Sequence, residues 1–327
     1  MINFQYIKPS SAAAAVAAIT KDNTSMFVAG GTNLVDLMKK GVTNPQKLID
    51  ITHLNLNKIE NQDNKVIIGS LALNSDVSEH EIINKDYPLL ALALKAGASQ
   101  QIRNMATVGG NMLQRTRCPY FNSTDMPCNK RQPGSGCGAL KGYNRMHAIF
   151  GASDKCIAVH PSDMCVALAA LDAIVNVTGT KGKRQIKFSQ FHRLPGEYPQ
   201  NDSTLAKGEL IISVEIPSNN FTKNVHYLKV RDRSSYAFAL VSVAVALIVE
   251  DGVIKDARLA MGGVAHKPWR LTETEQFLVG KNVSEEVFSE AGKLSVRNAK
   301  GYGHNNFKLK LSANSVAGAL KIAAAKS

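Results

Sequence analysis

The sequence predicts an α+β fold, and two observations support this class. In the first two thirds of the chain, strand-like runs of about four or five residues alternate with helix-like runs, which favours two small sheets. In the last third, two long apolar runs joined by Asp251-Gly252 precede three helix-like stretches. This end of the chain predicts a sheet covered by helices on one face.

Capping and turn residues set the elements expected in the first part of the chain. Ser10 is expected to cap a helix that runs to Ile19, and Gly69 is expected to end a short strand. The expected strands are residues 1–6, 26–29, 48–51 and 65–69, and the expected helices are 10–19, one that begins at 34, one after the Asn74-Ser75-Asp76 cap, and 87–98.

The same signals organise the rest of the chain. His160-Pro161-Ser162-Asp163 caps a helix that ends at Leu171, and Pro217 stops a strand. A Ser/Asn/Thr-rich stretch at 217–224 is the expected domain boundary, and Gly262-Gly263 is expected to be a turn at a strand end. The expected strands are 173–178, 185–188, 208–217, 225–231, 239–249 and 253–261, and the expected last helices are 272–278, 284–298 and 312–325.

Two diglycine turns are candidate anion-binding sites. Gly30-Gly31-Thr32-Asn33 lies between a predicted strand and a predicted helix, and Thr107-Val108-Gly109-Gly110-Asn111 repeats the combination of Gly-Gly with Thr and Asn. Glycine lets backbone N–H groups approach an anion, and a helix start adds a favourable dipole. We expect the two turns to meet at one diphosphate, although neither matches the G-x-G-x-x-G or P-loop pattern.

All five cysteines lie between Gln101 and Cys165, and their spacing suits a cluster-bearing loop. They stand at 118, 128, 137, 156 and 165, so none forms the C-x2-C pair of a zinc ribbon. The long gaps suit the corners of an iron–sulfur cube, and seven Lys or Arg against one acid between residues 101 and 150 suit its negative charge. A solvated basic loop with free cysteines explains the spacing equally well. Cys165 lies in an apolar helix-like run and is expected to pack in a core.

Charge and hydropathy limit the classes of function. The formal net charge of +13 raises a basic nucleic-acid-binding protein with a metal or iron–sulfur module as an alternative, but 6% aromatic residues and dispersed basic side chains argue against nucleic acid. The longest apolar run, Ala237 to Val249, is too short to span a bilayer, so no membrane partner is expected. No signal-peptide pattern is found at the start.

Four motifs give the sequence a family resemblance. They are Val28 to Leu34, Thr107 to Asn111, His160 to Asp163, and Lys229 to Arg233. In this order they resemble the FAD-binding subunits of the molybdenum hydroxylase (xanthine oxidase) family over essentially the whole chain. The stretches Cys118 to Phe121, Pro127 to Arg131 and Ser234 to Ser242 are most similar to the FAD/[4Fe-4S] subunits of bacterial periplasmic aldehyde oxidoreductases.

The resemblance implies the fold and its domains. Residues 1–222 would form a two-lobed FAD-binding PCMH-type domain of the vanillyl-alcohol-oxidase kind, with lobes at about 1–56 and 57–222 and a cysteine-rich insert at about 115–157. Residues 223–327 would form a domain like the C-terminal domain of carbon monoxide dehydrogenase flavoproteins.

The resemblance also implies the residues of the site. Asp163 would accept hydrogen bonds from the ribityl hydroxyls, Ile212 would pack near the flavin, and Lys229 would lie by its pyrimidine edge, where a cation stabilises reduced flavin. No residue of this chain is implied to be catalytic. Backbone amides of Ala29, Gly30, Gly31, Thr32, Asn33 and Leu34, and of Thr107, Gly109, Gly110 and Asn111, would bind the pyrophosphate of FAD. A [4Fe-4S] cluster would be held by Cys118, Cys128, Cys137 and Cys156, with Cys165 outside the set.

The implied function is electron transfer within a heterotrimer. This subunit would pass electrons from a [2Fe-2S] small subunit through FAD to an external acceptor, while a large subunit with the molybdenum cofactor oxidises an aldehyde. The resemblance implies export to the periplasm with a partner that carries the signal, and a cytoplasmic location is the alternative. A free-standing flavin oxidase is a third class of function.

Overall fold

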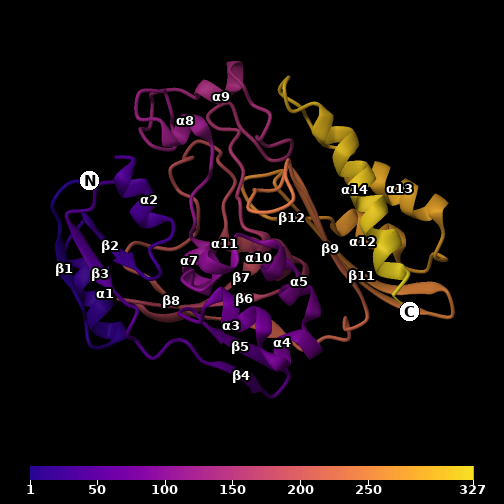
Figure 1. The fold of residues 1–327 in the computed structure, drawn as a ribbon, viewed down its shortest axis with the longest axis horizontal. Coiled ribbons are helices and arrows are strands. Elements are labelled where there is room, and N and C mark those ends of the chain that lie inside the picture. Colours follow the sequence, from indigo (N-terminus) through magenta and orange to yellow (C-terminus); the bar gives the residue numbers. More distant parts are fainter. Residues whose placement is uncertain (327) are drawn as a thin grey trace.

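Three β-sheets organise residues 1–326, the part of the chain that the computed structural model describes (Figure 1). They follow one another across the molecule, from a three-stranded sheet at the N-terminal end through a five-stranded sheet to a four-stranded sheet beside the C-terminus. This mixture of helices and sheets confirms the predicted α+β class. The three-stranded and five-stranded sheets are the two small sheets expected in the first part of the chain.

The first sheet is parallel and carries the first glycine turn at its edge. Parallel strands need crossover connections, and here short helices supply them. The helix α1 is capped by Ser11, whose Oγ accepts from Ala14 N–H at 3.1 Å, so the predicted cap at Ser10 is wrong by one residue. The sheet order is β1 (Gln5–Ile7), β3 (Lys47–Asp50) and β2 (Ser25–Val28), and the connecting helices are α1 (Ala12–Thr20) and α2 (Leu34–Lys39).

The central sheet is antiparallel and carries the largest hydrophobic core. Its order is β4 (Ile59–Gln62), β5 (Lys65–Gly69), β8 (Leu210–Pro217), β6 (Ile174–Gly179) and β7 (Gly182–Lys187). The helices of this region are α3 (Asn74–Glu79), α4 (Glu81–Asp86), α5 (Pro88–Ala96), α6 (Gln100–Arg103), α7 (Val108–Met112), α10 (Asp163–Ala170) and α11 (Phe188–Phe191). Strand β4 and helices α4, α6, α7 and α11 were not predicted, because runs of four to six residues carry little periodicity.

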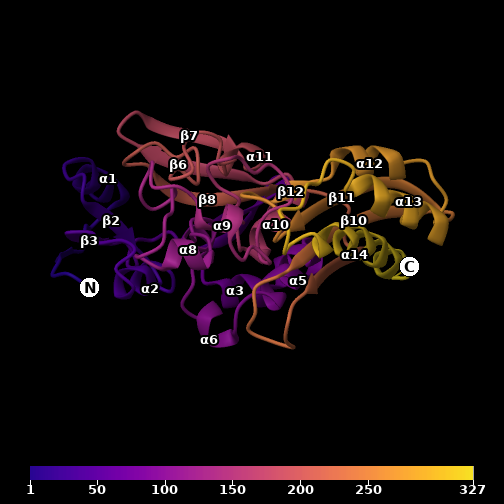
Figure 2. The same ribbon diagram turned by 90° about the horizontal axis from the view of Figure 1, so that it is seen from above.

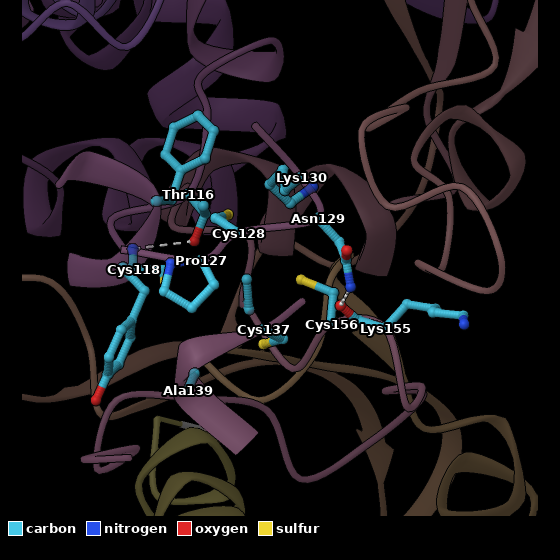
Figure 3. Close-up of a pocket in the computed structure, with 13 residues that line it drawn as sticks. Thr116, Cys118, Pro127, Cys128, Asn129, Lys130, Cys137, Ala139, Lys155 and Cys156 are labelled. Atoms are coloured by element: carbon cyan, nitrogen blue, oxygen red, sulfur yellow. Dashed lines mark hydrogen bonds between the residues drawn. The ribbon is translucent and has the colours of Figure 1, made fainter. Parts of the chain in front are cut away.

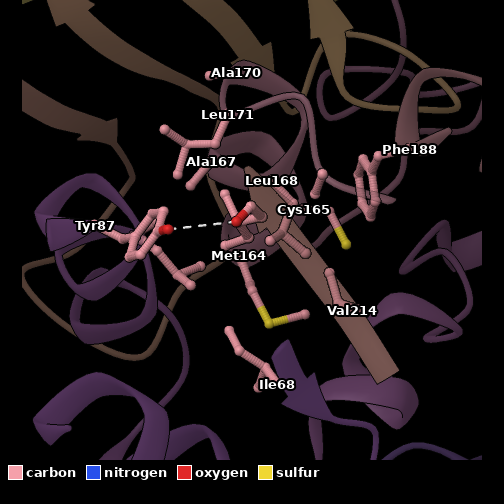
Figure 4. Close-up of a cluster of buried hydrophobic side chains, with 14 of the residues drawn as sticks. Ile68, Tyr87, Met164, Cys165, Ala167, Leu168, Ala170, Leu171, Phe188 and Val214 are labelled. Atoms are coloured by element: carbon pink, nitrogen blue, oxygen red, sulfur yellow. Dashed lines mark hydrogen bonds between the residues drawn. The ribbon is translucent and has the colours of Figure 1, made fainter. Parts of the chain in front are cut away.

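The helix α10 fills the centre of this core. Cys165 is fully buried on it, among Leu168, Phe188 and Val214 (Figure 4). Burial in these apolar surroundings raises the pKa of its thiol to about 12. The prediction that Cys165 packs in a core is therefore confirmed.

The C-terminal sheet is covered on both faces, which differs from the prediction of one covered face. In β10, Val243 and Val245 belong to the core shared with the last helices, whereas Ala244 and Ala246 belong to the core shared with α5 and α10. Burial on both faces explains why this strand reads as one continuous apolar run. The sheet order is β12 (Trp269–Arg270), β11 (Val253–Gly262), β10 (Val241–Glu250) and β9 (Asn224–Val230), and the last helices are α12 (Thr272–Leu278), α13 (Glu285–Ser295) and α14 (Phe307–Ala324). Within residues 1–326, no helix has the length and apolar character needed to cross a membrane.

The cysteine-rich insert lies between α2 and the C-terminal sheet (Figures 1 and 2). It contains the short helices α8 (Pro119–Asn122) and α9 (Gly138–Lys141). The helix α14 fastens it, because the buried Lys308 ammonium donates to the carbonyl oxygens of His147 at 3.1 Å and Gly263 at 2.8 Å. Burial lowers the pKa of Lys308 to about 7, with a smaller contribution from Arg145.

Two helical glycines should respond oppositely to the same substitution. Gly318→Ala adds a methyl group into open space on α14, so it should stabilise the protein by about 1 kcal/mol through helix propensity. Gly292→Ala on α13 places a Cβ inside contact distance of the Ala313 carbonyl, so it should destabilise the protein by about 1–3 kcal/mol. Urea unfolding of the two variants measures both effects. Equal stability of the two variants would contradict the close packing of α13 on α14.

The buried Lys308 predicts a pH dependence of stability. The unfolded chain holds the lysine proton up to a pH near the ordinary value of 10.5, while the folded chain releases it near 7. Between these values the unfolded state binds more protons, so the free energy of unfolding should rise with pH, by as much as roughly 3–5 kcal/mol. In Lys308→Met this rise should shrink, whereas Lys310→Met, at an exposed position on the same helix, should keep it. An unchanged pH profile in Lys308→Met would show that the amine is not desolvated.

Candidate functional site

The two glycine turns lie against each other. A Cβ built on Gly30 would overlap the backbone carbonyl of Met105, which stands two residues before Thr107. The backbone N–H of Arg115, just after the second turn, donates to Asn33 Oδ1 at 2.8 Å. The turns therefore meet as the sequence predicts. Glycine at position 30 is required by this approach of two backbones, whether or not a ligand is bound.

The first turn presents a row of free N–H groups. From Gly30 to Leu34, no backbone N–H donates to any acceptor within residues 1–326. Gly31 has φ +69°, a left-handed conformation that favours glycine and turns the chain toward α2. The side-chain Nδ2 of Asn33 is buried and has no partner in the described chain. A buried donor without an acceptor is costly, so Asn33 Nδ2 calls for a ligand, and the free N–H groups beside it favour an anionic one.

The second turn is different, because most of its amides are already used inside the protein. Thr107 caps α7 with its hydroxyl, and Gly109 lies in contact with Ser70. The acceptors of the four N–H groups from Val108 to Asn111 are Ala72 O at 3.0 Å, Ser70 O at 2.8 Å, Thr107 Oγ1 at 3.2 Å and Thr107 O at 2.8 Å. The N–H groups of Gly109, Gly110 and Asn111 are therefore used inside the protein, whereas the N–H of Thr107 donates to no acceptor within residues 1–326. The binding of a pyrophosphate by this turn stays a prediction, with the Thr107 amide, side chains and the exposed Gly110 surface left for a ligand.

Asp163 and Lys229 form a buried ion pair. Lys229 Nζ donates to Asp163 Oδ2 at 2.8 Å and to Ala96 O at 3.0 Å, and the Tyr227 hydroxyl donates to Asp163 Oδ1 at 2.8 Å. Burial raises the pKa of Asp163, against the opposing effect of Lys229 and Tyr227. The structure shows that these two residues are bonded to each other, and the contact of each with a flavin stays a prediction.

Ile212 lies on β8 and packs in the core cluster of the first sheet. It is half-buried in the core cluster that also contains Ala29, and its carbonyl oxygen accepts from Ser70 N–H at 2.9 Å. The Ser70 carbonyl oxygen also accepts from the N–H of Gly109, so Ser70 links Ile212 to the second turn.

A cavity of about 130 Å³, the Asp163 cavity, opens beside the ion pair. The Ser162 hydroxyl donates to Asn111 Oδ1 at 2.6 Å, so the cavity adjoins the second glycine turn. Its wall includes Arg117 and Phe238, with the guanidinium 5.1 Å from the ring centroid. The sequence did not indicate Arg117 as a site residue, because only the fold brings it to the same cavity as Asp163.

The four cysteines assigned by resemblance line one pocket, the cysteine pocket (Figure 3). Cys118 stands at the N-terminus of α8 and Cys137 at the N-terminus of α9. Cys128 pairs with Cys137 in an isolated antiparallel bridge, which sets these two residues opposite each other. Cys156 completes the lining from a separate loop. Thr116 and Cys118 also line the Asp163 cavity, so the two spaces share a wall.

One buried cation, Lys130, lies against the cysteine pocket. Lys130 lines it and donates to Pro199 O at 2.6 Å, and it forms an ion pair with Asp202, which is also paired with Arg115. Burial opposes ionisation of Asp202, but Lys130 and Arg115 outweigh it and lower the Asp202 pKa to about 2. Through its ion pairs with Lys130 and Arg115, Asp202 links the cysteine loop to the chain that follows the second glycine turn.

The pKa values of the thiols and the space between them indicate what the cysteine pocket can bind. Burial raises the pKa of Cys118 to about 12, whereas a hydrogen bond from Cys156 lowers the pKa of Cys137 to about 6. The space between the thiols is about 10 Å³, the size of one water molecule. Four thiols and nearby cations fit the chemistry of an iron–sulfur cluster, and the thiols would have to spread apart to take one.

Among residues 1–326, the side chains that meet at the distances of a single metal ion are His160, Cys165 and His192, all buried. Both imidazoles lie by Met112 O, at 3.3 Å for His160 Nε2 and 2.8 Å for His192 Nε2. Burial lowers the pKa of both histidines, to about 4 for His192. They are neutral at pH 7 and hold the end of α7 in place.

Two family descriptions match the chain. "FAD binding domain in molybdopterin dehydrogenase" matches residues 2–219, and "CO dehydrogenase flavoprotein C-terminal domain" matches residues 226–321. Together they cover both the glycine turns and the C-terminal sheet.

Named relatives and solved structures agree with this. The chain is 46% identical over 327 residues to the aldehyde oxidoreductase FAD-binding subunit PaoB of Escherichia coli, covering 99% of each chain. It is 29% identical to the glyceraldehyde dehydrogenase medium chain of Sulfolobus acidocaldarius, covering 89% of this chain and 87% of that one. A carbon monoxide dehydrogenase chain from Hydrogenophaga pseudoflava superposes with a TM-score of 0.78 at 24% identity, over 100% of this chain and 99% of that one, which shows a shared fold.

The Asp163–Lys229 pair predicts a specific pattern of stability. Lys229→Met leaves a buried carboxylate without its cation and should cost about 3–5 kcal/mol in the free energy of unfolding. Adding Asp163→Asn to the same chain should recover most of this loss, because the uncompensated charge is removed. Lys223→Met, at an exposed position near β9, is the control and should cost little. A loss below about 1 kcal/mol in Lys229→Met would contradict a buried ion pair.

Proposed function

Because this chain belongs to the FAD-binding subunits of the molybdenum hydroxylase family, we propose that it is the electron-transfer subunit of an aldehyde oxidoreductase. In this proposal it receives electrons from a [2Fe-2S] small subunit and delivers them to an external acceptor, while a large subunit with the molybdenum cofactor oxidises the aldehyde. The relative of 46% identity, named an aldehyde oxidoreductase subunit, supports the substrate class.

The observation that supports the proposal most strongly is the row of free N–H groups from Gly30 to Leu34. A diphosphate is an anion that accepts several such hydrogen bonds, and the start of α2 adds a favourable dipole. The unpaired Nδ2 of Asn33 supplies one further donor. FAD, when bound, supplies the exchange between one-electron and two-electron transfer.

The Asp163 cavity continues from the turns toward the C-terminal sheet. Asn111 and Ser162 join the second turn to the cavity, and Arg117 lines its wall. A guanidinium at this place would stabilise negative charge on a reduced flavin, the role that the sequence suggested for Lys229. Lys229 would then act by holding the Asp163 carboxylate in place.

We also propose a [4Fe-4S] cluster held by Cys118, Cys128, Cys137 and Cys156. When bound, such a cluster supplies one-electron transfer or a covalent fastening of the loop. We favour the fastening role, because the insert contains only two short helices and otherwise consists of loops with little regular structure. The cations Lys130 and Arg115 would balance part of the charge on the cluster.

The partners and location are proposals of the same kind. A small [2Fe-2S] subunit and a large molybdenum-cofactor subunit would complete a heterotrimer, as the medium-chain names of several relatives suggest. Export to the periplasm would depend on a signal carried by a partner.

Spectroscopy and iron analysis of the native complex test the proposal. The spectrum should show flavin bands, and Cys128→Ser should lower the iron and acid-labile sulfide content of this subunit while FAD remains bound. Cys165→Ala is the matched control and should keep both, because Cys165 lies in the core of α10. Absence of flavin would sink the proposed function, and iron loss in Cys165→Ala would sink the proposed ligand set.

The same variant separates the two roles of the cluster. If the cluster fastens the loop, the Cys128→Ser complex should turn over at a near-normal rate once assembled. A rate lowered in proportion to the lost iron would favour a relay.

A further inference from the structure

Two buried histidines flank the cysteine pocket. His147 Nε2 lies 3.1 Å from Cys118 Sγ, and His266 Nε2 lies 3.9 Å from Cys156 Sγ. The shorter distance is that of a hydrogen bond to sulfur, and the longer one is a much weaker contact. His147 is therefore the histidine placed to influence the cysteine pocket.

The contacts of the His147 ring indicate which atom donates in its hydrogen bond with Cys118. Its Nδ1 is buried and has no hydrogen-bond partner within residues 1–326, so the hydrogen bond that the structure shows for the ring is the one between Nε2 and Cys118 Sγ. A cysteine that ligates iron is a thiolate and has no proton to donate. The hydrogen bond in a loaded site must then run from the imidazole Nε2–H to the sulfur.

The C-terminal domain holds His147 in this position. Asn305 Nδ2 and Lys308 Nζ both donate to the His147 carbonyl oxygen, at 3.3 Å and 3.1 Å. Asn144 Nδ2 donates to Tyr302 O at 2.7 Å, and His147 N–H donates to Asn144 O at 3.0 Å. The backbone of His147 is thus held by a segment from the far end of the chain, which limits how far the ring can move from Cys118 when the pocket is filled.

His147 also stands between the two spaces of the site. It lines the Asp163 cavity together with Cys118 and Arg117, while Cys118 lines the cysteine pocket as well. Cys118 is therefore the cysteine that faces the cavity, and His147 contacts its sulfur from the cavity side.

We propose that His147 is a positioning residue that raises the reduction potential of the cluster by donating Nε2–H to the thiolate of Cys118. This inference rests on the proposed cluster at the four cysteines. Reduction adds one electron to a cluster that is already anionic, so a hydrogen bond to a ligand sulfur stabilises the reduced form more than the oxidised form. An effect of about tenfold on the equilibrium constant for reduction corresponds to about 59 mV for one electron.

The test is a redox titration of the purified native complex with dithionite, followed by electron paramagnetic resonance of the reduced cluster. His147→Phe keeps a ring but removes the N–H donor. It should lower the equilibrium constant for reduction about tenfold, which lowers the midpoint potential by about 59 mV. His147→Gln can place an amide N–H near the sulfur and should restore part of the shift. His266→Phe is the matched control at the longer contact and should shift the potential less.

The outcomes separate this inference from the proposed cluster. If this subunit contains no iron in the wild-type complex, the proposed cluster is wrong, and the proposed binding of FAD is unaffected. His147→Phe with a full iron content and an unchanged midpoint would overturn the inference alone.

If the His147→Phe complex fails to assemble, a second measurement on a variant that keeps His147 tests the same hydrogen bond. In the His266→Phe complex labelled with [15N]histidine, hyperfine spectroscopy of the reduced cluster should detect one coupled histidine nitrogen. Absence of that coupling would overturn the proposed hydrogen bond.

Discussion

The close contact of Gly30 with the Met105 carbonyl is the constraint on which the site depends. Through this contact, the first glycine turn packs against the segment that leads into the second turn. Asn33 Oδ1 also accepts from the N–H of Arg115, which holds the chain that follows the second turn. In the second turn, the N–H groups of Val108 and Gly109 donate to Ala72 and Ser70. The second turn thus supports the first, whose N–H groups from Gly30 to Leu34 have no acceptor in the described part of the chain and are available to an anion.

The rest of the fold extends from this contact to the other parts of the site. One face of strand β10 shares a core with α10, so the C-terminal sheet cannot move away from α10 without opening that core. Asp163 at the start of α10 and Lys229 on β9 are joined across this interface by a buried ion pair. From the other side of the sheet, Lys308 holds the carbonyl of His147 and so orders the wall between the Asp163 cavity and the cysteine pocket.

Local signals in the sequence predicted the local parts of the structure. The strand, diglycine and helix unit at β2 and α2, the cap at Ser162 and the hairpin at Asp251-Gly252 depend on neighbouring residues, and the structure has all three. Family resemblance selected the four cysteines that line one pocket. Contacts between distant segments were not predictable in the same way. Nothing near Gly109 in the sequence reveals that its N–H is taken by Ser70, and nothing near Asp163 reveals that its partner is Lys229.

The central claim is that the free amides of the first turn bind the diphosphate of FAD, and flavin affinity tests it most directly. Titration calorimetry of the flavin-depleted complex with FAD and with riboflavin compares ligands that share the isoalloxazine ring and the ribityl chain, whereas only FAD carries the diphosphate and the adenosine. Several charge-assisted hydrogen bonds should make FAD bind at least about a hundredfold tighter, or about 2.7 kcal/mol. Equal affinities for FAD and riboflavin would show that the amides from Gly30 to Leu34 do not hold a diphosphate.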